Sequence, residues 1–177
     1  MKKRLTLLQM DVHVNDVEYN YNRVQELLTQ SLTENPDIIV LPETWNTGFH
    51  PSDDLITIAD RNGERTKSLL SAFAKEHNVN IVGGSVAVAK DDLVFNTSYA
   101  YNREGTLVGE YSKMHGFSPA KEDKYFASGT HTTHFELDGI PCSTVICYDI
   151  RFPELVRMAS LPGTELLFVP AQWPTMR

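Results

Sequence analysis

The sequence predicts a layered α/β fold, on the strength of two observations. Apolar strand-like runs alternate with helical spacings, and several strand-like runs are separated only by short turns. A mixture of βα units and hairpins is typical of sheets covered by helices. The 177 residues contain no repeat, low-complexity tract or linker, so we expect a single domain over residues 1–177.

The first βα unit is expected near the amino terminus. Residues 5–10 form a short apolar run, and Asn15 or Asp16 provides a helix cap. Apolar side chains then recur at helical spacing, at Val17, Tyr21, Val24 and Leu28. Pro36 breaks the chain before residues 38–41, whose continuous apolar character is typical of a strand buried on both faces of a sheet.

The middle of the chain combines a loop, a helix and three strands. Residues 44–62 are expected to form a loop over the carboxyl end of the preceding strand. A helix follows, with apolar residues Leu69, Leu70, Phe73 and Ala74. Residues 81–89, 93–101 and 107–111 predict antiparallel strands joined by tight turns. Gly83 and Gly84 inside the first run indicate a bulge or a close backbone approach.

The last third of the chain predicts a hairpin, a short helix and a buried strand. The hairpin pairs residues 135–137 with 140–146, the helix begins at Pro153, and the strand covers residues 166–169. Cys147 therefore lies at a strand-to-helix turn. Such a turn exposes a nucleophile, and helix amides favour its anion.

Composition excludes some classes of partner. The chain has 16 basic and 23 acidic residues, a net charge of −7, and no basic cluster interleaved with aromatic residues, so we expect no nucleic-acid ligand. The basic start, residues 1–4, leads into an apolar stretch too short for a signal core or a membrane span. We therefore expect a cytoplasmic protein without a membrane partner.

The two cysteines are expected to be free thiols. Cys142 and Cys147 lie five residues apart, which places their side chains on opposite faces of one strand and argues against a disulfide. We interpret Cys142 as a small buried residue of the core.

Three short motifs resemble those of the nitrilase superfamily of carbon-nitrogen hydrolases. Residues 147–154, Cys-Tyr-Asp-Ile-Arg-Phe-Pro-Glu, resemble its cysteine motif. Leu-Pro-Glu-Thr-Trp at 41–45 resembles its catalytic glutamate motif, and Tyr-Ser-Lys-Met-His-Gly-Phe at 111–117 is similar to its catalytic lysine segment. The three occur in the family's order.

The resemblance implies a fold and an assembly. It implies a four-layer α-β-β-α sandwich of the nitrilase type, no cofactor and a homodimer. The resemblance covers only the earlier part of the superfamily's pattern, so we expect this chain to lack the C-terminal part of the sandwich. An incomplete sandwich exposes sheet edges, which leaves open a non-catalytic fragment or scaffold.

Amide cleavage explains why these residue types are needed. The reaction requires a nucleophile, a proton carrier and a positive charge for the oxyanion. Cys147, Glu43 and Lys113 supply one each, and we expect the backbone amide of Tyr148 to assist Lys113. The resemblance also includes a second glutamate after the lysine, for which Glu122 is the candidate.

Four further residues are candidates for substrate binding. Trp45 and Trp173 each follow a predicted strand and are expected to line the pocket, and for Trp173 packing in the core is an equal alternative. His115 favours a structural role beside Lys113. Arg151 suits a substrate carboxylate, although an ion pair with Asp149 or Glu154 is the safer expectation.

We expect no metal. His131 and His134 lie three residues apart, but no further Cys or His completes a tetrahedral ligand set.

The substrate class rests on resemblance. Residues 147–154 together with Val-Pro-Ala-Gln-Trp-Pro at 169–174 are most similar to the ω-amidase-like branch, which hydrolyses the terminal amide of 2-oxo acids such as 2-oxoglutaramate. An N-carbamoyl amino acid amidohydrolase remains the alternative, because the same thioester chemistry serves a ureido carbon.

Overall fold

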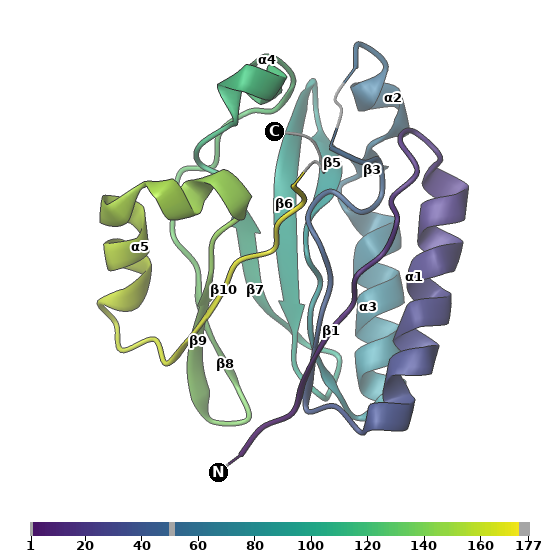
Figure 1. Cartoon of the computed structure of the whole chain (residues 1–177), viewed down its shortest axis with the longest axis vertical. Helices are drawn as coiled ribbons and strands as arrows, with labels where there is room; N and C mark the ends of the chain where they lie inside the picture. The colour runs from purple at the N-terminus through teal and green to yellow at the C-terminus, as the bar shows by residue number, and fades with distance from the viewer. Residues whose placement is uncertain (1, 50–51, 174–177) are drawn as a thin grey trace.

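The computed structural model describes residues 2–49 and 52–173 and arranges them in four layers (Figure 1). Helices α1 (Val17–Ser31) and α3 (Glu64–His77) cover one face of a larger sheet. The opposite face of this sheet packs on a smaller sheet, whose own outer face is covered by α5 (Pro153–Ser160). The predicted α-β-β-α arrangement is confirmed.

The larger sheet has seven strands in the order β1-β2-β4-β6-β5-β3, with β7 also paired to β6. Strands β1, β2 and β4 are mutually parallel, and β6 runs antiparallel to β4, β5 and β7. Their bounds are β1 (Leu5–Leu7), β2 (Ile38–Val40), β3 (Asp60–Arg61), β4 (Asn80–Val82), β5 (Val86–Lys90), β6 (Leu93–Tyr101) and β7 (Leu107–Ser112).

The smaller sheet has three strands in the order β10-β9-β8. The predicted hairpin pairs β8 (His134–Leu137) antiparallel with β9 (Ile140–Thr144). Strand β10 (Leu166–Phe168) lies parallel to β9, and α5 connects the two. Shorter helical segments occupy the connections: η1 (Leu32–Glu34), α2 (Leu55–Ile58), η2 (Ser118–Ala120), α4 (Glu122–Tyr125) and η3 (Cys147–Arg151).

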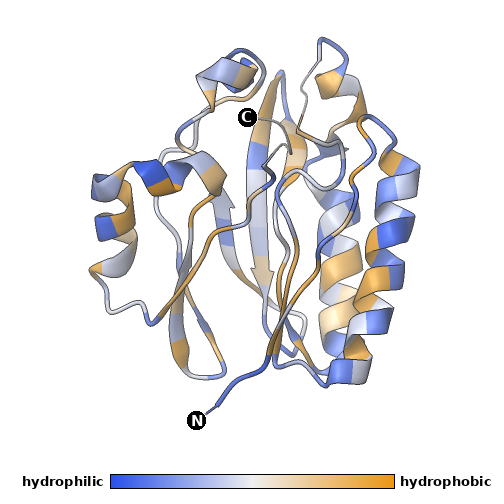
Figure 2. Cartoon of the chain, viewed as in Figure 1, coloured by the Kyte–Doolittle hydropathy of each residue, from blue (hydrophilic) through white to orange (hydrophobic). Residues whose placement is uncertain are grey.

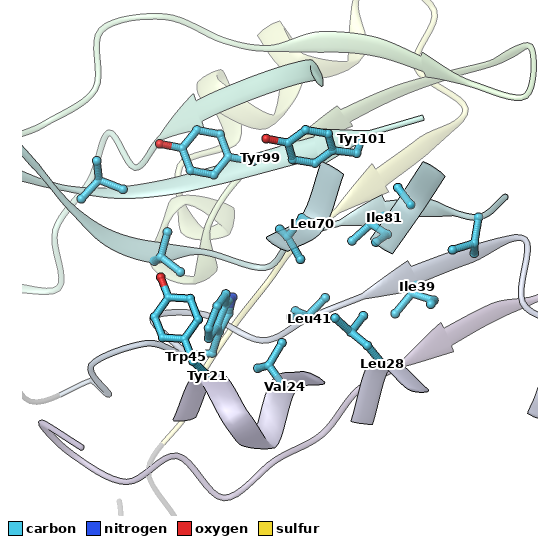
Figure 3. Packing of buried hydrophobic residues seen from close by; sticks show 14 residues of the cluster. Tyr21, Val24, Leu28, Ile39, Leu41, Trp45, Leu70, Ile81, Tyr99 and Tyr101 are labelled. Atoms are coloured by element: carbon cyan, nitrogen blue, oxygen red, sulfur yellow. The ribbon is translucent and has the colours of Figure 1, made fainter. Parts of the chain in front are cut away.

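The outer core lies between the two long helices and the larger sheet. Asp16 caps α1, because its side chain accepts a 3.1 Å hydrogen bond from the amide of Tyr19. The predicted helical positions Tyr21, Val24 and Leu28 are buried and pack toward Ile39 and other strand residues (Figure 3). Figure 2 shows hydrophobic residues along the central strands and alternating hydrophobic and hydrophilic patches along both helices.

The inner core joins the two sheets. Ile38 and Val40 of β2 face the smaller sheet, whereas Ile39 faces the helices. Their partners across the interface include Phe135, Leu137, Cys142 and Phe168. Strand β2 is thus buried on both faces, as its continuous apolar run predicts. The prediction that Cys142 is a buried free thiol is also confirmed.

The expected strand over residues 81–89 is two strands. Gly83 to Ser85 separate β4 from β5, and Gly84 adopts a left-handed φ of 62°. A Cβ atom at Gly84 would lie 2.0 Å from the carbonyl oxygen of Pro42. The glycine pair therefore marks a close backbone approach, directly beside the end of β2. The region predicted as a loop, 44–62, also contains α2 and β3.

Within the described ranges, no helix has both the length and the apolar character needed to cross a bilayer.

Candidate active site

The three residues with predicted catalytic roles each follow a strand. Glu43 follows β2, Lys113 follows β7, and Cys147 follows β9. Two of these strands belong to the larger sheet and one to the smaller, so the packing of the sheets brings the three side chains together. The Lys113 Nζ lies 2.8 Å from Glu43 Oε1. The Cys147 thiol is close enough to Glu43 and Lys113 for both to shift its pKa.

Glu43 is fully buried and its carboxylate is held from three directions. Its Oε1 accepts hydrogen bonds from Lys113 Nζ at 2.8 Å and from Asn96 Nδ2 at 3.0 Å. Its Oε2 accepts one from the backbone amide of Gln172 at 3.0 Å. Burial raises the pKa of Glu43, although Lys113 opposes the shift. A raised pKa suits a carboxylate that must both accept and return a proton.

The backbone after Glu43 is fixed by the segment between β4 and β5. Thr44 has a left-handed φ of 42°, and its amide donates a 3.0 Å hydrogen bond to the Ser85 hydroxyl. Asn46 binds both the amide and the carbonyl of Ala87, at 2.8 and 3.0 Å. These bonds orient Glu43 toward the interior between the sheets.

Trp45 is a core residue and does not line a pocket. Its side chain is fully buried in the outer core, where its ring meets Tyr21 edge-on at 4.8 Å and its Nε1 donates to Gly83 O at 2.9 Å. The expectation that Trp45 lines the pocket is therefore wrong, because the whole side chain is enclosed by the outer core.

Lys113 lies between two carboxylates. Glu122, the first residue of α4, has both carboxylate oxygens 2.8 Å from Lys113 Nζ, and it also accepts a 2.7 Å hydrogen bond from the amide of Phe117. Burial lowers the pKa of Lys113, but Glu43 and Glu122 outweigh this effect and raise it. Lys113 is thus a buried side chain whose surroundings favour its cationic form. Glu122 occupies the predicted second-glutamate position, and neighbouring Asp123 is exposed.

Cys147 occupies a sharp turn, as predicted, but the turn buries it. Its φ is 46°, a left-handed conformation that is unfavourable for a side chain with a Cβ. Its amide donates to Pro170 O at 2.9 Å. The segment that follows is a 3-10 helix, and α5 begins only at Pro153.

The surroundings of Cys147 disfavour its thiolate form. Burial, reinforced by the charge of Glu43, raises the pKa of Cys147 to about 12. The expectations of an exposed thiol and of helix amides that favour its anion are therefore wrong, because the side chain is only 7% exposed and faces a carboxylate. The site must remove the thiol proton by means of a base.

The amide of Tyr148 is available beside the thiol. The flanking amides of Cys147 and Asp149 donate to Pro170 O and Ile146 O, at 2.9 and 3.0 Å. Within the described part of the chain, the Tyr148 amide donates to no protein acceptor. An unpaired amide next to a nucleophile is the arrangement that an oxyanion requires.

Asp149 connects the cysteine turn to the lysine segment. Its buried carboxylate accepts hydrogen bonds from the Tyr111 hydroxyl at 2.7 Å, the Ile146 amide at 3.0 Å and the His115 amide at 2.9 Å. The His115 Nδ1 also lies 2.9 Å from Asp149 Oδ1, and the His115 ring stacks on Phe152 at 3.6 Å. His115 therefore has the structural position that its sequence context favours.

Arg151 and Trp173 lie beside each other, next to residues that flank the site. The Arg151 guanidinium lies 5.4 Å from the ring centroid of Trp173 and 5.9 Å from that of Tyr148. The ion pair expected with Asp149 or Glu154 is absent from the described structure, because Asp149 is turned inward to the contacts above. Trp173 lines a pocket of about 380 Å³, together with Phe49, Gln172 and residues 9–12.

Metal ligands are not gathered anywhere in residues 2–49 and 52–173: no three His, Cys, Asp or Glu side chains come together as a potential site.

Two residues of the site were missed by the sequence analysis. Asn96 lies in the middle of β6 and contacts Glu43 and Glu122, and the Gln172 amide follows β10 and contacts Glu43. A polar residue inside an otherwise strand-like run was the available signal for Asn96. A backbone amide such as that of Gln172 leaves no signal in side-chain chemistry.

Comparison with known sequences identifies relatives over the whole chain. Residues 4–177 match the family model described as carbon-nitrogen hydrolase. A 2-oxoglutaramate amidase from Bacillus subtilis is 40% identical over 177 residues, which cover 100% of this chain and 68% of that protein. An omega-amidase from Xenopus tropicalis is 31% identical, over 96% of this chain and 63% of that protein. The chain thus spans about two thirds of the length of these relatives.

Solved structures share the fold. An amidase from Nesterenkonia superimposes with a TM-score of 0.87 at 21% identity, covering 99% of this chain and 66% of that one. A CN-hydrolase superfamily protein from Xanthomonas campestris, solved with an arsenic adduct in its active site, superimposes with a TM-score of 0.86 at 29% identity, over 99% and 66% of the two chains.

Proposed function

The chain belongs to the carbon-nitrogen hydrolase family, and on that premise we propose that it hydrolyses the C–N bond of a small carboxylic amide. The reaction would proceed through a thioester on Cys147 and release ammonia and a carboxylic acid. The observation that supports this proposal most directly is the buried contact of Lys113 with Glu43, beside the thiol of Cys147. Nucleophile, base and cation are the three groups that amide cleavage requires.

The first half of the reaction forms the thioester. Glu43, ionised beside Lys113, accepts the thiol proton as the sulfur attacks the amide carbonyl. Lys113 Nζ has three N–H bonds; with one directed at Glu43 and one shared between the two oxygens of Glu122, the third would be available to the oxyanion, together with the Tyr148 amide. Glu43 then returns the proton to the nitrogen. The C–N bond breaks, ammonia leaves, and the acyl group stays on the sulfur.

The second half of the reaction restores the enzyme. Glu43, ionised again, accepts a proton from a water molecule that attacks the thioester carbonyl. The C–S bond of the resulting tetrahedral intermediate breaks, the acid product leaves, and the proton on Glu43 returns to the sulfur of Cys147. One water is consumed for each amide. In both halves Glu122 acts on Lys113, which it holds in place through two contacts of 2.8 Å.

The substrate we propose is a 2-oxo acid with a terminal amide, such as 2-oxoglutaramate. The relatives named 2-oxoglutaramate amidase and omega-amidase support this class. We further propose that Trp173 and Arg151, which lie beside each other, contact the substrate. A guanidinium beside an aromatic ring suits a carboxylate-bearing substrate. A cytoplasmic homodimer remains our expectation for the assembly.

Product analysis tests the reaction. The protein is incubated with 2-oxoglutaramate and, separately, with an N-carbamoyl amino acid, and ammonia and carbon dioxide are measured. We expect ammonia from the amide alone; carbon dioxide with ammonia would identify an N-carbamoyl amidohydrolase instead. Cys147→Ala is expected to be inactive, and Cys142→Ala, which alters the other buried thiol, to retain activity. Equal ammonia release by the native protein and Cys147→Ala would refute the mechanism.

A further inference from the structure

Asn96 contacts both acids of the site and is not one of the three reacting groups. Its Nδ2 donates to Glu43 Oε1 at 3.0 Å and to Glu122 Oε1 at 3.2 Å. Asn96 lies in β6 and is 1% exposed, whereas the two glutamates come from the end of β2 and from α4. One amide group therefore joins two carboxylates that are far apart in sequence.

The orientation of this amide is determined by charge. If the Asn96 oxygen faced the site, three acceptors would meet with no donor between them, so the nitrogen must face the carboxylates. The oxygen then points away and is buried without a hydrogen-bond partner among the described residues. An unpaired buried carbonyl is unfavourable for folding. Asn96 thus donates hydrogen bonds to both carboxylates, while its own side-chain oxygen has no partner among the described residues.

The charges of the site show what the amide contributes. Glu43 and Glu122 carry two negative charges when ionised, and Lys113 carries one positive charge. Burial disfavours the ionised form of Glu43, and so does the charge of Glu122. Asn96 adds hydrogen bonds to both anions without adding charge. The other side chain that faces Glu43, the thiol of Cys147, is the group that Glu43 must deprotonate.

We propose that Asn96 is a positioning residue for the reaction: its amide holds the Glu43 and Glu122 carboxylates ionised on either side of Lys113, so that Glu43 is free to accept the proton of Cys147. The strand β6 supports this geometry directly, because the backbone carbonyl of Asn96 also accepts the Lys113 amide at 2.8 Å. The inference rests on the roles proposed for Glu43 and Cys147, and it adds a residue that never touches the substrate.

Alkylation of Cys147 tests this role without any substrate. The rate of its modification by iodoacetamide is measured by peptide mass between pH 4 and pH 9, a range that includes the ordinary glutamate pKa of about 4.3 and the higher values of a buried carboxyl group. The rate is expected to rise as Glu43 ionises. Loss of the amide donor destabilises the Glu43 anion, so in Asn96→Leu this rise should move to higher pH by about one unit.

Asn80 provides a matched control. It is a fully buried asparagine of β4, its Nδ2 donates to the backbone carbonyl of Asp37 at 2.9 Å, and its side-chain oxygen is also unpaired. Asn80→Leu removes a comparable amide away from the glutamates. We expect the alkylation profile of Asn80→Leu to match that of the native protein.

The outcomes separate this inference from the proposed function. Asn96→Ser, whose side chain is too short to reach both carboxylates, serves as a second variant and should show the same shift. A native profile in either folded variant, or the failure of both to fold while Asn80→Leu folds, would overturn the positioning role. If the native protein releases no ammonia from any amide, the proposed reaction is wrong, whereas the alkylation shift still decides the role of Asn96.

Discussion

The hydroxyl of Tyr111 donates a 2.7 Å hydrogen bond to the buried carboxylate of Asp149. Tyr111 precedes Lys113 by two residues, and Asp149 follows Cys147 by two residues. This bond therefore joins the two segments that carry the cation and the nucleophile. Because the segments belong to different sheets, the distance between Lys113 and Cys147 depends on a contact across the sandwich.

Replacing Asp149 with Asn should weaken both the fold and the site. An amide offers one acceptor oxygen where the carboxylate offers two, so at least one of its donors loses its partner. We expect the free energy of unfolding to fall by about 1–3 kcal/mol and the alkylation of Cys147 to change, as measured by urea titration and peptide mass. Tyr111→Phe, which removes one donor only, should have the smaller effect on stability. Native stability and native alkylation in Asp149→Asn would contradict the connecting role.

Replacing Lys113 with Met should lower the free energy of unfolding, because the two buried carboxylates lose the cation between them. The variant leaves Glu43 and Glu122 buried together without a cation, which costs about 3–5 kcal/mol at neutral pH. Glu43 then loses the cation that lowers its pKa, so its folded-state pKa lies further above the unfolded value, the folded form binds more protons, and the loss should shrink as the pH falls. Urea titrations at pH 7 and pH 5 measure the difference. Adding Glu122→Gln should recover part of the loss at pH 7, and a loss that is independent of pH would contradict the prediction.

The decline of activity at acidic pH, the acidic limb of the pH profile, should follow the protonation of Glu43. Burial raises the pKa of Glu43 above the ordinary value of 4.5, and the charge of Glu122 raises it further. Below that pKa Glu43 is protonated and accepts no proton from Cys147, so kcat/KM should decline as the pH falls through it. Glu122→Gln removes one raising influence, and its acidic limb should therefore lie at lower pH than that of the native protein. A limb displaced to higher pH would show that the group being titrated is not Glu43.

Replacing Gly84 with Ala should disturb the position of Glu43 through the backbone. The new Cβ would lie 2.0 Å from Pro42 O, next to Glu43, and the φ of 62° is itself unfavourable for alanine. We expect a loss of at least about 2 kcal/mol and of most activity. Gly139→Ala is the control: its φ is 77°, but a Cβ there meets nothing within 4 Å, so only the backbone strain of about 1–2 kcal/mol remains. Equal losses in the two variants would mean that the contact with Pro42 has no effect.

Much of the fold, and the meeting of Glu43, Lys113 and Cys147, could be predicted from the sequence. Strand β2 is a continuous apolar run, and Glu43, Lys113 and Cys147 stand directly after strands, where the edges of packed sheets meet. Strands and the positions that follow them depend on the local pattern of apolar residues, which is visible in the sequence. The division between β4 and β5 was not predicted, because Gly84 is required by the backbone of Pro42, which is distant in sequence.

The rest of the site depends on contacts between distant segments. Trp45 lies two residues after Glu43, yet it packs in the core because the 83–87 segment turns it inward. The burial of Cys147 follows from how the two sheets close over it, which its neighbours in sequence do not reveal. Asn96 acquires its partners only when the folded chain brings the segment after β2, with Glu43, and α4, with Glu122, to the same side of β6.

The labelling rates of the two thiols should measure two different opening motions of the structure. Cys142 lies in the core between the sheets, and Cys147 lies at the end of that core beside Glu43. Reagents reach the first thiol only when the sheets separate, whereas local opening of the turn suffices for the second. The ratio of their labelling rates therefore measures how much of the molecule must open at once. Two thiols within six residues of sequence should therefore report how cooperatively the molecule opens, and no added probe is required.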